Sequence, residues 1–210
     1  MNLVFDIETG PACDIILNQV KPSFTAPSNY KDPEKIASAI SAEEAEWKSK
    51  AALSATTGVV LAVGLKTKER ERLIIGDEPF ILNAFWNEWS IQRLEDGCGK
   101  FVGFCIKSFD LPFLVQRSWV NGVKVPFDLF EGRYWSRNFV DLQEVWLCNG
   151  FERKGANLDI ICKALGLGGK NGNGKDFAQL FSSDKPAAME YLKRDIELTY
   201  NLAVKLGIVG

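Results

Sequence analysis

Short apolar runs and longer amphipathic stretches alternate along this chain in an order that leaves few folds open. Apolar runs typical of buried strands lie at 2–5, 58–65, 71–77, 101–105 and 138–142. Stretches of helical composition or spacing lie at 32–53, 79–94, 110–122, 142–148, 157–166 and 184–206. This order predicts an α/β domain with a mixed five-stranded sheet flanked by helices.

The composition excludes several kinds of catalytic site. Histidine is absent, so a Ser-His-Asp triad, a histidine-bound zinc and an imidazole base are impossible. The cysteines lack C-x-x-C spacing, and we expect them to be small core residues: Cys13, Cys98, Cys105, Cys148 and Cys162. The net charge of −2 is not the basic charge that is typical of nucleic-acid-binding proteins. It does not exclude a nuclease whose acidic residues are neutralised by bound metal ions.

The sequence also carries expectations about location. No apolar run approaches the roughly 20 residues that span a bilayer. Asp6 comes too early for a signal peptide. We therefore expect no membrane association and a cytoplasmic protein, either nucleoid-associated or, for a viral protein, in the host cytoplasm.

Three pairs of residues combine carboxylates with positions at which a site could form. Asp6 and Glu8 end the first strand and, because a strand has period two, point to one face, where they repel unless a cation lies between them. Asp110 follows a later strand and Phe109, although an N-cap explains it equally well. Tyr191 and Asp195 are four residues apart on one helix face. Each alone has an ordinary explanation: a polar turn, a cap or a solvated face.

Taken together and in this order, D-x-E, F-D and Y-x-x-x-D resemble the DEDD superfamily of 3′–5′ exonucleases, in particular its tyrosine subgroup, DEDDy. The chain is most similar to the proofreading exonuclease domains of family B DNA polymerases. Their second motif reads G-Y/F-N-x-x-N-F-D-x-P-Y/F-L, and this chain reads GFCIKSFDLPFL at 103–114. The resemblance implies a ribonuclease H-like fold, with 1–210 as a single exonuclease domain and an insertion at about 20–55.

The resemblance also implies the chemistry. Asp6, Glu8, Asp110 and Asp195 would hold two divalent cations, Mg²⁺ or Mn²⁺, and Tyr191 would orient the attacking water. The expected reaction is metal-dependent hydrolysis from the 3′ end of DNA, preferably single-stranded, which releases nucleoside 5′-monophosphates. A polymerase or another replication or repair protein is the implied partner.

The residues implied to contact the substrate are Thr9, Gly10, Cys105, Phe109, Lys170 and Lys175. The first two would touch the terminal nucleotide, and the two lysines lie in a glycine-rich loop that could close over the phosphates. Cys105 stands where relatives usually have asparagine, which bears on substrate preference. Phe109 either contacts the strand or packs beneath the site.

The segment GRYWSRNF at 132–139 mixes Arg133 and Arg137 with Tyr134 and Trp135. Interleaved cations and aromatic rings are typical of an edge that binds a nucleic-acid strand. A surface loop anchored by its tryptophan is an equally good interpretation.

Two alternatives to a DNA exonuclease stay open at this point. One is an RNA-trimming exonuclease of the ribonuclease D type, which shares the tyrosine and aspartate pattern. The other is a non-catalytic nucleic-acid-binding module on the same fold, although such relatives usually lose one or more of the acids, and all are present here.

Overall fold

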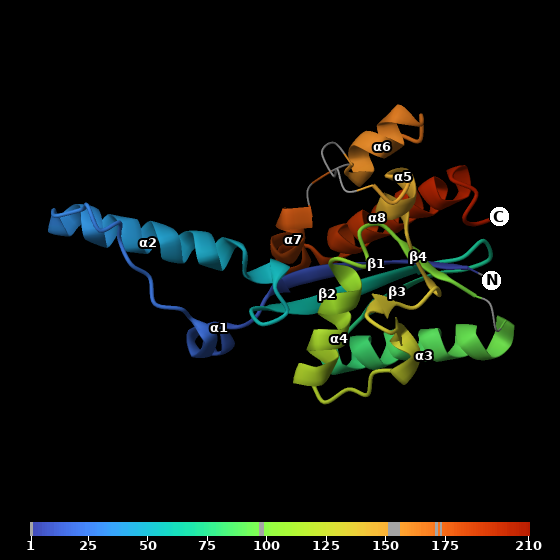
Figure 1. Ribbon diagram of the computed structural model, residues 1–210, viewed down its shortest axis with the longest axis horizontal. Coiled ribbons are helices and arrows are strands. Elements are labelled where there is room, and N and C mark those ends of the chain that lie inside the picture. Colours follow the sequence, from blue (N-terminus) through green and yellow to red (C-terminus); the bar gives the residue numbers. More distant parts are fainter. Residues whose placement is uncertain (1, 97–98, 151–155, 171, 173) are drawn as a thin grey trace. The chain divides into compact units, whose positions relative to one another are not determined.

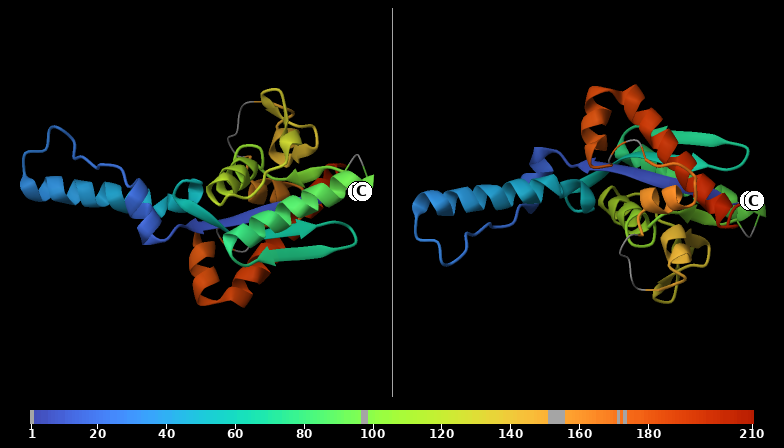
Figure 2. Two further views of the ribbon diagram at one scale, coloured as in Figure 1. Left: turned by 90° about the horizontal axis from the view of Figure 1, so that it is seen from below. Right: turned by 90° about the horizontal axis from the view of Figure 1, so that it is seen from above.

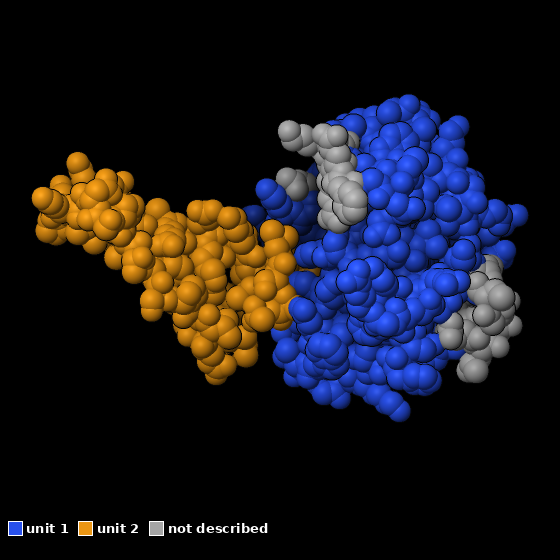
Figure 3. Space-filling view, viewed as in Figure 1, with its two compact units in different colours: residues 1–8, 60–210 blue, residues 9–59 orange. Residues whose placement is uncertain are grey.

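The computed structural model describes residues 2–96, 99–150, 156–170, 172 and 174–210. The chain divides into two compact units, which Figure 3 colours separately. Unit 1 comprises residues 1–8 and 60–210, and unit 2 comprises residues 9–59. The segment predicted to be an insertion lies inside unit 2.

A five-stranded mixed sheet forms the centre of the fold, with the strand order β3-β2-β1-β4-β7 (Figure 1). Its strands are β1 (Leu3–Pro11), β2 (Gly58–Lys66), β3 (Glu71–Ile75), β4 (Phe101–Gly103) and β7 (Phe139–Asp141). β4 runs parallel to β1 and β7, with Val102 opposite both Val4 and Val140, whereas β2 and β3 are antiparallel. The predicted α/β fold with five strands is confirmed.

Helices cover both faces of this sheet (Figures 1 and 2). One face carries α3 (Glu78–Asp96) and α4 (Asp110–Val120). The other carries α8 (Lys185–Lys205), together with α5 (Leu142–Trp146), α6 (Leu158–Ala164) and α7 (Phe177–Ser183). The parallel strands β1, β4 and β7 point their carboxyl ends to the same edge of the sheet, so side chains that follow these strands can meet there.

The two layers enclose different cores. Between the sheet and α3 lies an aromatic core in which Trp89 stacks on Phe139 with 4.6 Å between ring centroids. Phe5, Phe85 and Phe101 complete it with tilted and edge-on contacts. The face beneath α8 buries an aliphatic cluster that includes Val4, Val102, Leu142, Ile196 and Leu202.

Helix α8 begins and ends as its sequence predicts. The Asp184 side chain accepts a hydrogen bond from the Ala187 backbone N–H, and Pro186 occupies the first turn. After the last turn, Gly207 takes a φ of +71°, a conformation that glycine adopts without steric cost. The apolar residues of its inner face are buried: Leu192, Ile196, Leu198 and Leu202.

Several elements were not anticipated from the sequence. These are α1 (Asp14–Val20), α7 and a small hairpin of β5 (Phe130–Glu131) and β6 (Tyr134–Trp135). The stretch 32–53 is not one helix, because α2 (Pro33–Ser49) is followed by a separate 3-10 turn, η1 (Ala51–Leu53). Two further 3-10 turns are η2 (Phe127–Leu129) and η3 (Gly174–Asp176). Elements this short leave too few residues for a periodic pattern.

Unit 2 has little core of its own. Ala12, Leu17 and Ala51 are buried against Trp47 and Val59. α2 has no buried residue, and several of its contacts are between charged side chains. Such contacts include the ion pairs of Glu44 with Lys21 and Lys48 at 2.7 and 2.9 Å.

Two compositional expectations can be compared with the structure. Cys162 is buried, but Cys13 and Cys148 are exposed, so the prediction that the cysteines fill the core is wrong for these two. Cys98 lies outside the described residues. Within the described chain, none of the helices combines the length and the apolar character needed to cross a membrane.

Gly103 at the end of β4 is expected to be essential for packing. A Cβ at this position would lie 2.5 Å from Ile106 Cγ2 and 2.6 Å from the backbone oxygen of Phe5 in β1. Gly103→Ala should therefore lower the free energy of unfolding by about 2–3 kcal/mol, as overpacking does in cores. Urea denaturation measures this change.

Gly122→Ala is the matched control for this prediction. Gly122 has a φ of +65° and no atom near the position of a Cβ. Its replacement should cost only the backbone strain, about 1 kcal/mol. Equal losses in the two variants would show that the clash with Phe5 is relieved without cost.

Candidate active site

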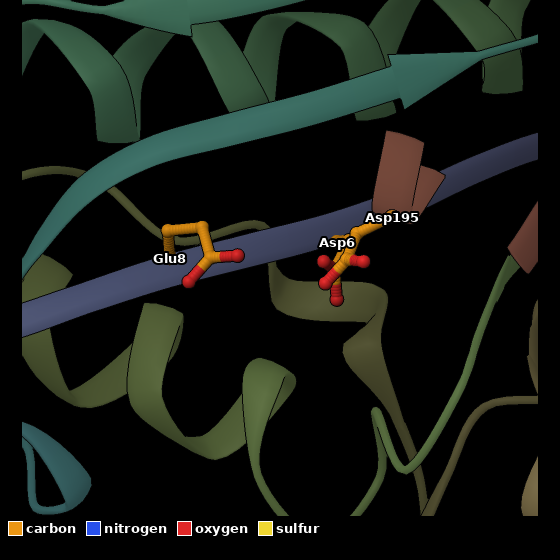
Figure 4. Close-up of side chains that lie close together, drawn as sticks. All are labelled: Asp6, Glu8 and Asp195. Atoms are coloured by element: carbon orange, nitrogen blue, oxygen red, sulfur yellow. The ribbon is translucent and has the colours of Figure 1, made fainter. Parts of the chain in front are cut away.

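Three carboxylates from distant parts of the sequence meet at the edge of the sheet. Asp6 and Glu8 project from β1 and Asp195 from α8, and each offers an oxygen within 4.8 Å of the others (Figure 4). Leu192 and Ile196 hold α8 on the sheet beside Asp195. A Cβ on Gly64 of β2 would lie 3.1 Å from Leu192 Cδ1, so glycine permits this close approach.

Asp110 lies beside this group without belonging to it. It is the first residue of α4 and only 3% exposed, and Phe109 precedes it as the N-cap residue. The Asp110 Oδ1 atom accepts a hydrogen bond of 3.3 Å from the Ile7 backbone N–H in β1. The carboxyl group therefore bonds across to the strand that carries Asp6 and Glu8, and the interpretation of Asp110 as a simple helix cap does not hold.

Three acids at this place hold their protons unusually strongly: Asp6, Glu8 and Asp110. Burial raises the pKa of Asp6 to about 6, and the charge of Asp195 adds to the effect. Burial and the charges of Asp6 and Asp195 raise the pKa of Glu8 to about 9. The pKa of Asp110 is also well above its usual range, because the group is buried and near Asp6. Ionised carboxylates this close repel one another unless a cation neutralises them.

Lys170 supplies a positive charge at this place. Its Nζ lies 2.6 Å from Asp195 Oδ2, and its charge also acts on Asp6 and Glu8. The backbone N–H of Lys170 donates to Asp159 Oδ1 at 2.8 Å, which holds the glycine-rich loop to α6. The lysine expected at the phosphates is thus paired with Asp195 in the acid cluster.

Lys170→Met is therefore expected to strengthen divalent-metal binding. A cation that binds Asp195 must replace the ammonium group, so removing that group should tighten Mn²⁺ binding about tenfold, or 1.4 kcal/mol. Isothermal titration calorimetry measures the change, with Lys175→Met as the control, because Lys175 is exposed in η3. Unchanged or weaker Mn²⁺ binding by Lys170→Met would contradict the idea that the lysine ammonium group and the metal ion compete for Asp195.

Tyr191 points its hydroxyl group into a buried position. The oxygen is inaccessible and has no hydrogen-bond partner among the described residues. Burial and the charges of Asp195 and Glu8 raise the pKa of this phenol above its usual value, so it stays protonated. The loop passes close by, since a Cβ on Gly172 would lie 3.0 Å from Tyr191 Cε2. The phenol and the Asp195 carboxylate are therefore close neighbours in the site.

The other residues implied to bind substrate have diverse surroundings. Thr9 and Gly10 belong to unit 2, where the Thr9 hydroxyl donates to the Ala52 carbonyl at 2.7 Å. Cys105 has a φ of +64°, and its Sγ lies 3.0 Å from the Ser108 hydroxyl oxygen. Phe109 packs against Phe113 with 5.6 Å between ring centroids. Their contact with a nucleotide stays a prediction.

Asp141 is a residue whose importance the sequence analysis missed. Its buried carboxylate accepts hydrogen bonds from the backbone N–H groups of Cys105, Lys107 and Gln143. It therefore caps α5 and also shapes the segment that leads to Asp110. The position of an aspartate between a predicted strand and a predicted helix indicates the helix cap. No sequence signal indicates its hydrogen bonds to the distant segment 105–107.

Fold and site together define a ribonuclease H-like protein with a carboxylate cluster at the carboxyl ends of its parallel strands. A family model described as a predicted 3′–5′ exonuclease related to the exonuclease domain of PolB matches residues 57–209. The chain belongs to this family. Asp110, Tyr191 and Asp195 lie inside the matched range, while Asp6 and Glu8 precede it.

A solved structure gives the same fold. The family B DNA polymerase from the hyperthermophilic archaeon Pyrobaculum calidifontis matches with a TM-score of 0.59 and 21% sequence identity. The match covers 97% of this chain and 24% of that polymerase chain. A comparison with curated proteins found no match.

Proposed function

We propose that this protein is a metal-dependent 3′–5′ exonuclease that acts on DNA, preferably single-stranded, and releases nucleoside 5′-monophosphates. The observation that carries the proposal is the convergence of Asp6, Glu8 and Asp195 within 4.8 Å of one another. Family membership supports the exonuclease activity. The choice of DNA rests on the likeness of the second motif to polymerase exonuclease domains.

The donor set fits hard divalent cations. Burial and neighbouring negative charge raise the pKa of Asp6 and Glu8, and a lysine ammonium lies among the carboxylates, so the site favours positive charge. Asp6, Glu8 and Asp195 would hold Mg²⁺ or Mn²⁺, with Asp110 next to them as a fourth ligand. Two such ions, when bound, would acidify a water molecule and stabilise the charge on the departing 3′ oxygen.

The chain's own residues would then position the reactants. Tyr191 stays protonated, so its hydroxyl group can donate a hydrogen bond and accept one from the attacking water. The water oxygen would bond to phosphorus as the bond from phosphorus to the 3′ oxygen of the preceding nucleotide breaks, which leaves the phosphate on the released nucleotide. Tyr191 and Asp195, one turn apart on α8, would hold the water and its metal in fixed relative positions.

An oligonucleotide assay tests this proposal. A 5′-labelled single-stranded DNA should shorten stepwise from its 3′ end with Mg²⁺ or Mn²⁺ and stay intact with EDTA. Parallel reactions with RNA and with duplex DNA of the same sequence decide the substrate class. Faster shortening of the RNA than of the DNA would show that RNA is the substrate. If none of the substrates were shortened, the proposed exonuclease activity would be refuted.

A further inference from the structure

The hairpin of β5 and β6 presents aromatic and cationic groups to solvent next to the segment that leads to Asp110. Tyr134 is 62% and Phe130 48% exposed. Phe130 stacks on Trp135, with 4.6 Å between centroids and 25° between planes. The Arg133 guanidinium lies over the Tyr134 ring at 4.9 Å. Large exposed rings cost free energy in water, so their accumulation here points to a ligand.

The sequence left two interpretations of the segment 132–139, a loop anchored by its tryptophan and an edge that binds a nucleic-acid strand. In the structure, different residues of the segment fit each of them. Trp135 is the anchor: its Nε1 donates to the Lys107 carbonyl at 2.9 Å, and its ring meets Phe139 edge-on. Arg137 is paired with Glu131 at 3.2 Å. Within the described part of the chain, Arg133 has no carboxylate partner, so its charge is available to a phosphate.

The hairpin is continuous with the active site through the segment 104–109. Lys107, to which Trp135 is bonded, lies three residues before Asp110. A pocket of about 320 Å³ lies between the two segments. Its lining consists of Lys107, Ser108, Arg133, Tyr134, Trp135, Asp141, Gln143 and Glu144. This volume suits a nucleobase or a phosphodiester unit.

We infer that this surface, formed by Arg133, Tyr134 and Phe130, binds the single strand upstream of the 3′ end that is being cut. Tyr134 would stack on a base, as aromatic side chains do in single-strand binding proteins, and Arg133 would contact a phosphate. Neither contact reads the identity of a base, so binding should tolerate any sequence. The inference rests on the proposed exonuclease function, which it extends from the scissile bond to the strand behind it.

A substrate-length comparison tests the inference. We would measure kcat/KM of Tyr134→Ala and Arg133→Ala on a 12-nucleotide single strand and on the p-nitrophenyl ester of thymidine 5′-monophosphate, which reaches only the acids. On the long substrate each variant should lose about tenfold, which corresponds to the lower range for one stacked base. Activity on the p-nitrophenyl ester should be unchanged. Tyr134→Trp, which keeps a ring that can stack, should retain most of the wild-type kcat/KM on the 12-nucleotide strand.

Phe80→Ala provides the matched control, since Phe80 is also exposed, at 53%, but lies on α3. Equal losses of Tyr134→Ala on both substrates would show a structural role, and no loss on the 12-mer would refute strand binding; either result overturns the inference. If the wild type hydrolysed neither substrate, the exonuclease proposal would fail by itself. Fluorescence polarisation with a labelled 12-mer would then decide the inference, which requires weaker binding by Tyr134→Ala than by Phe80→Ala.

Discussion

Asp195→Asn should reduce the rate of oligonucleotide shortening by about 10³-fold or more. The side chain keeps its size but loses the charge that lies with Asp6 and Glu8 at the centre of the carboxylate group. Losing one group that stabilises transition-state charge typically costs 10²- to 10³-fold, and a metal ligand also determines whether the ion binds at all. Single-turnover kinetics at saturating Mn²⁺ would measure the chemical step.

Glu190→Gln is the control for this variant. Glu190 lies on the same helix, is exposed and pairs with Arg194 at 3.1 Å, so the substitution removes an equal charge outside the site. Its rate should stay within about twofold of the wild type, because surface substitutions of this kind change little. A rate for Asp195→Asn within tenfold of the control would exclude Asp195 from the chemistry.

Removing divalent metal should abolish activity and also lower stability, and the loss of stability should be larger at high pH. The raised pKa values of Asp6, about 6, and Glu8, about 9, favour the protonated acids in the folded protein. Their stabilising effect is present below the ordinary carboxyl range and is lost as pH rises through these values. At about pH 8.5 the metal-free site therefore carries more repulsion than at about pH 5.5.

Added metal should reverse this trend, since it binds the ionised carboxylates. With Mg²⁺ at about 100 times its Kd, linkage gives about 2.7 kcal/mol, or an increase in unfolding temperature of about 5–10 °C at the higher pH. The increase at about pH 5.5 should be much smaller. Scanning calorimetry with Mg²⁺ or EDTA measures both, and Asp195→Asn should show little increase at either pH. A shift independent of pH would contradict the raised pKa values.

Local patterns were enough to predict most of the framework. The apolar runs predicted the five strands of the sheet, because a buried strand needs apolar residues regardless of which strands it pairs with. Helix α8 was predicted to within a residue at each end, since its cap, its proline and its apolar spacing are all local. The hairpin of β5 and β6 was missed, because two residues per strand form no period, and its place depends on the bond from Trp135 to Lys107.

The sequence by itself determined which groups are available: two acids two residues apart on a strand, an aspartate after a later strand, a tyrosine one turn before a last aspartate, and no histidine. Only the tertiary structure decided that Asp195 meets Asp6 and Glu8, that Lys170 lies among them and that Asp141 holds the segment before Asp110. Spacing along a strand or helix follows from backbone geometry. Contact between segments far apart in the chain follows from how α8 and the loops pack on the sheet, which no local pattern records.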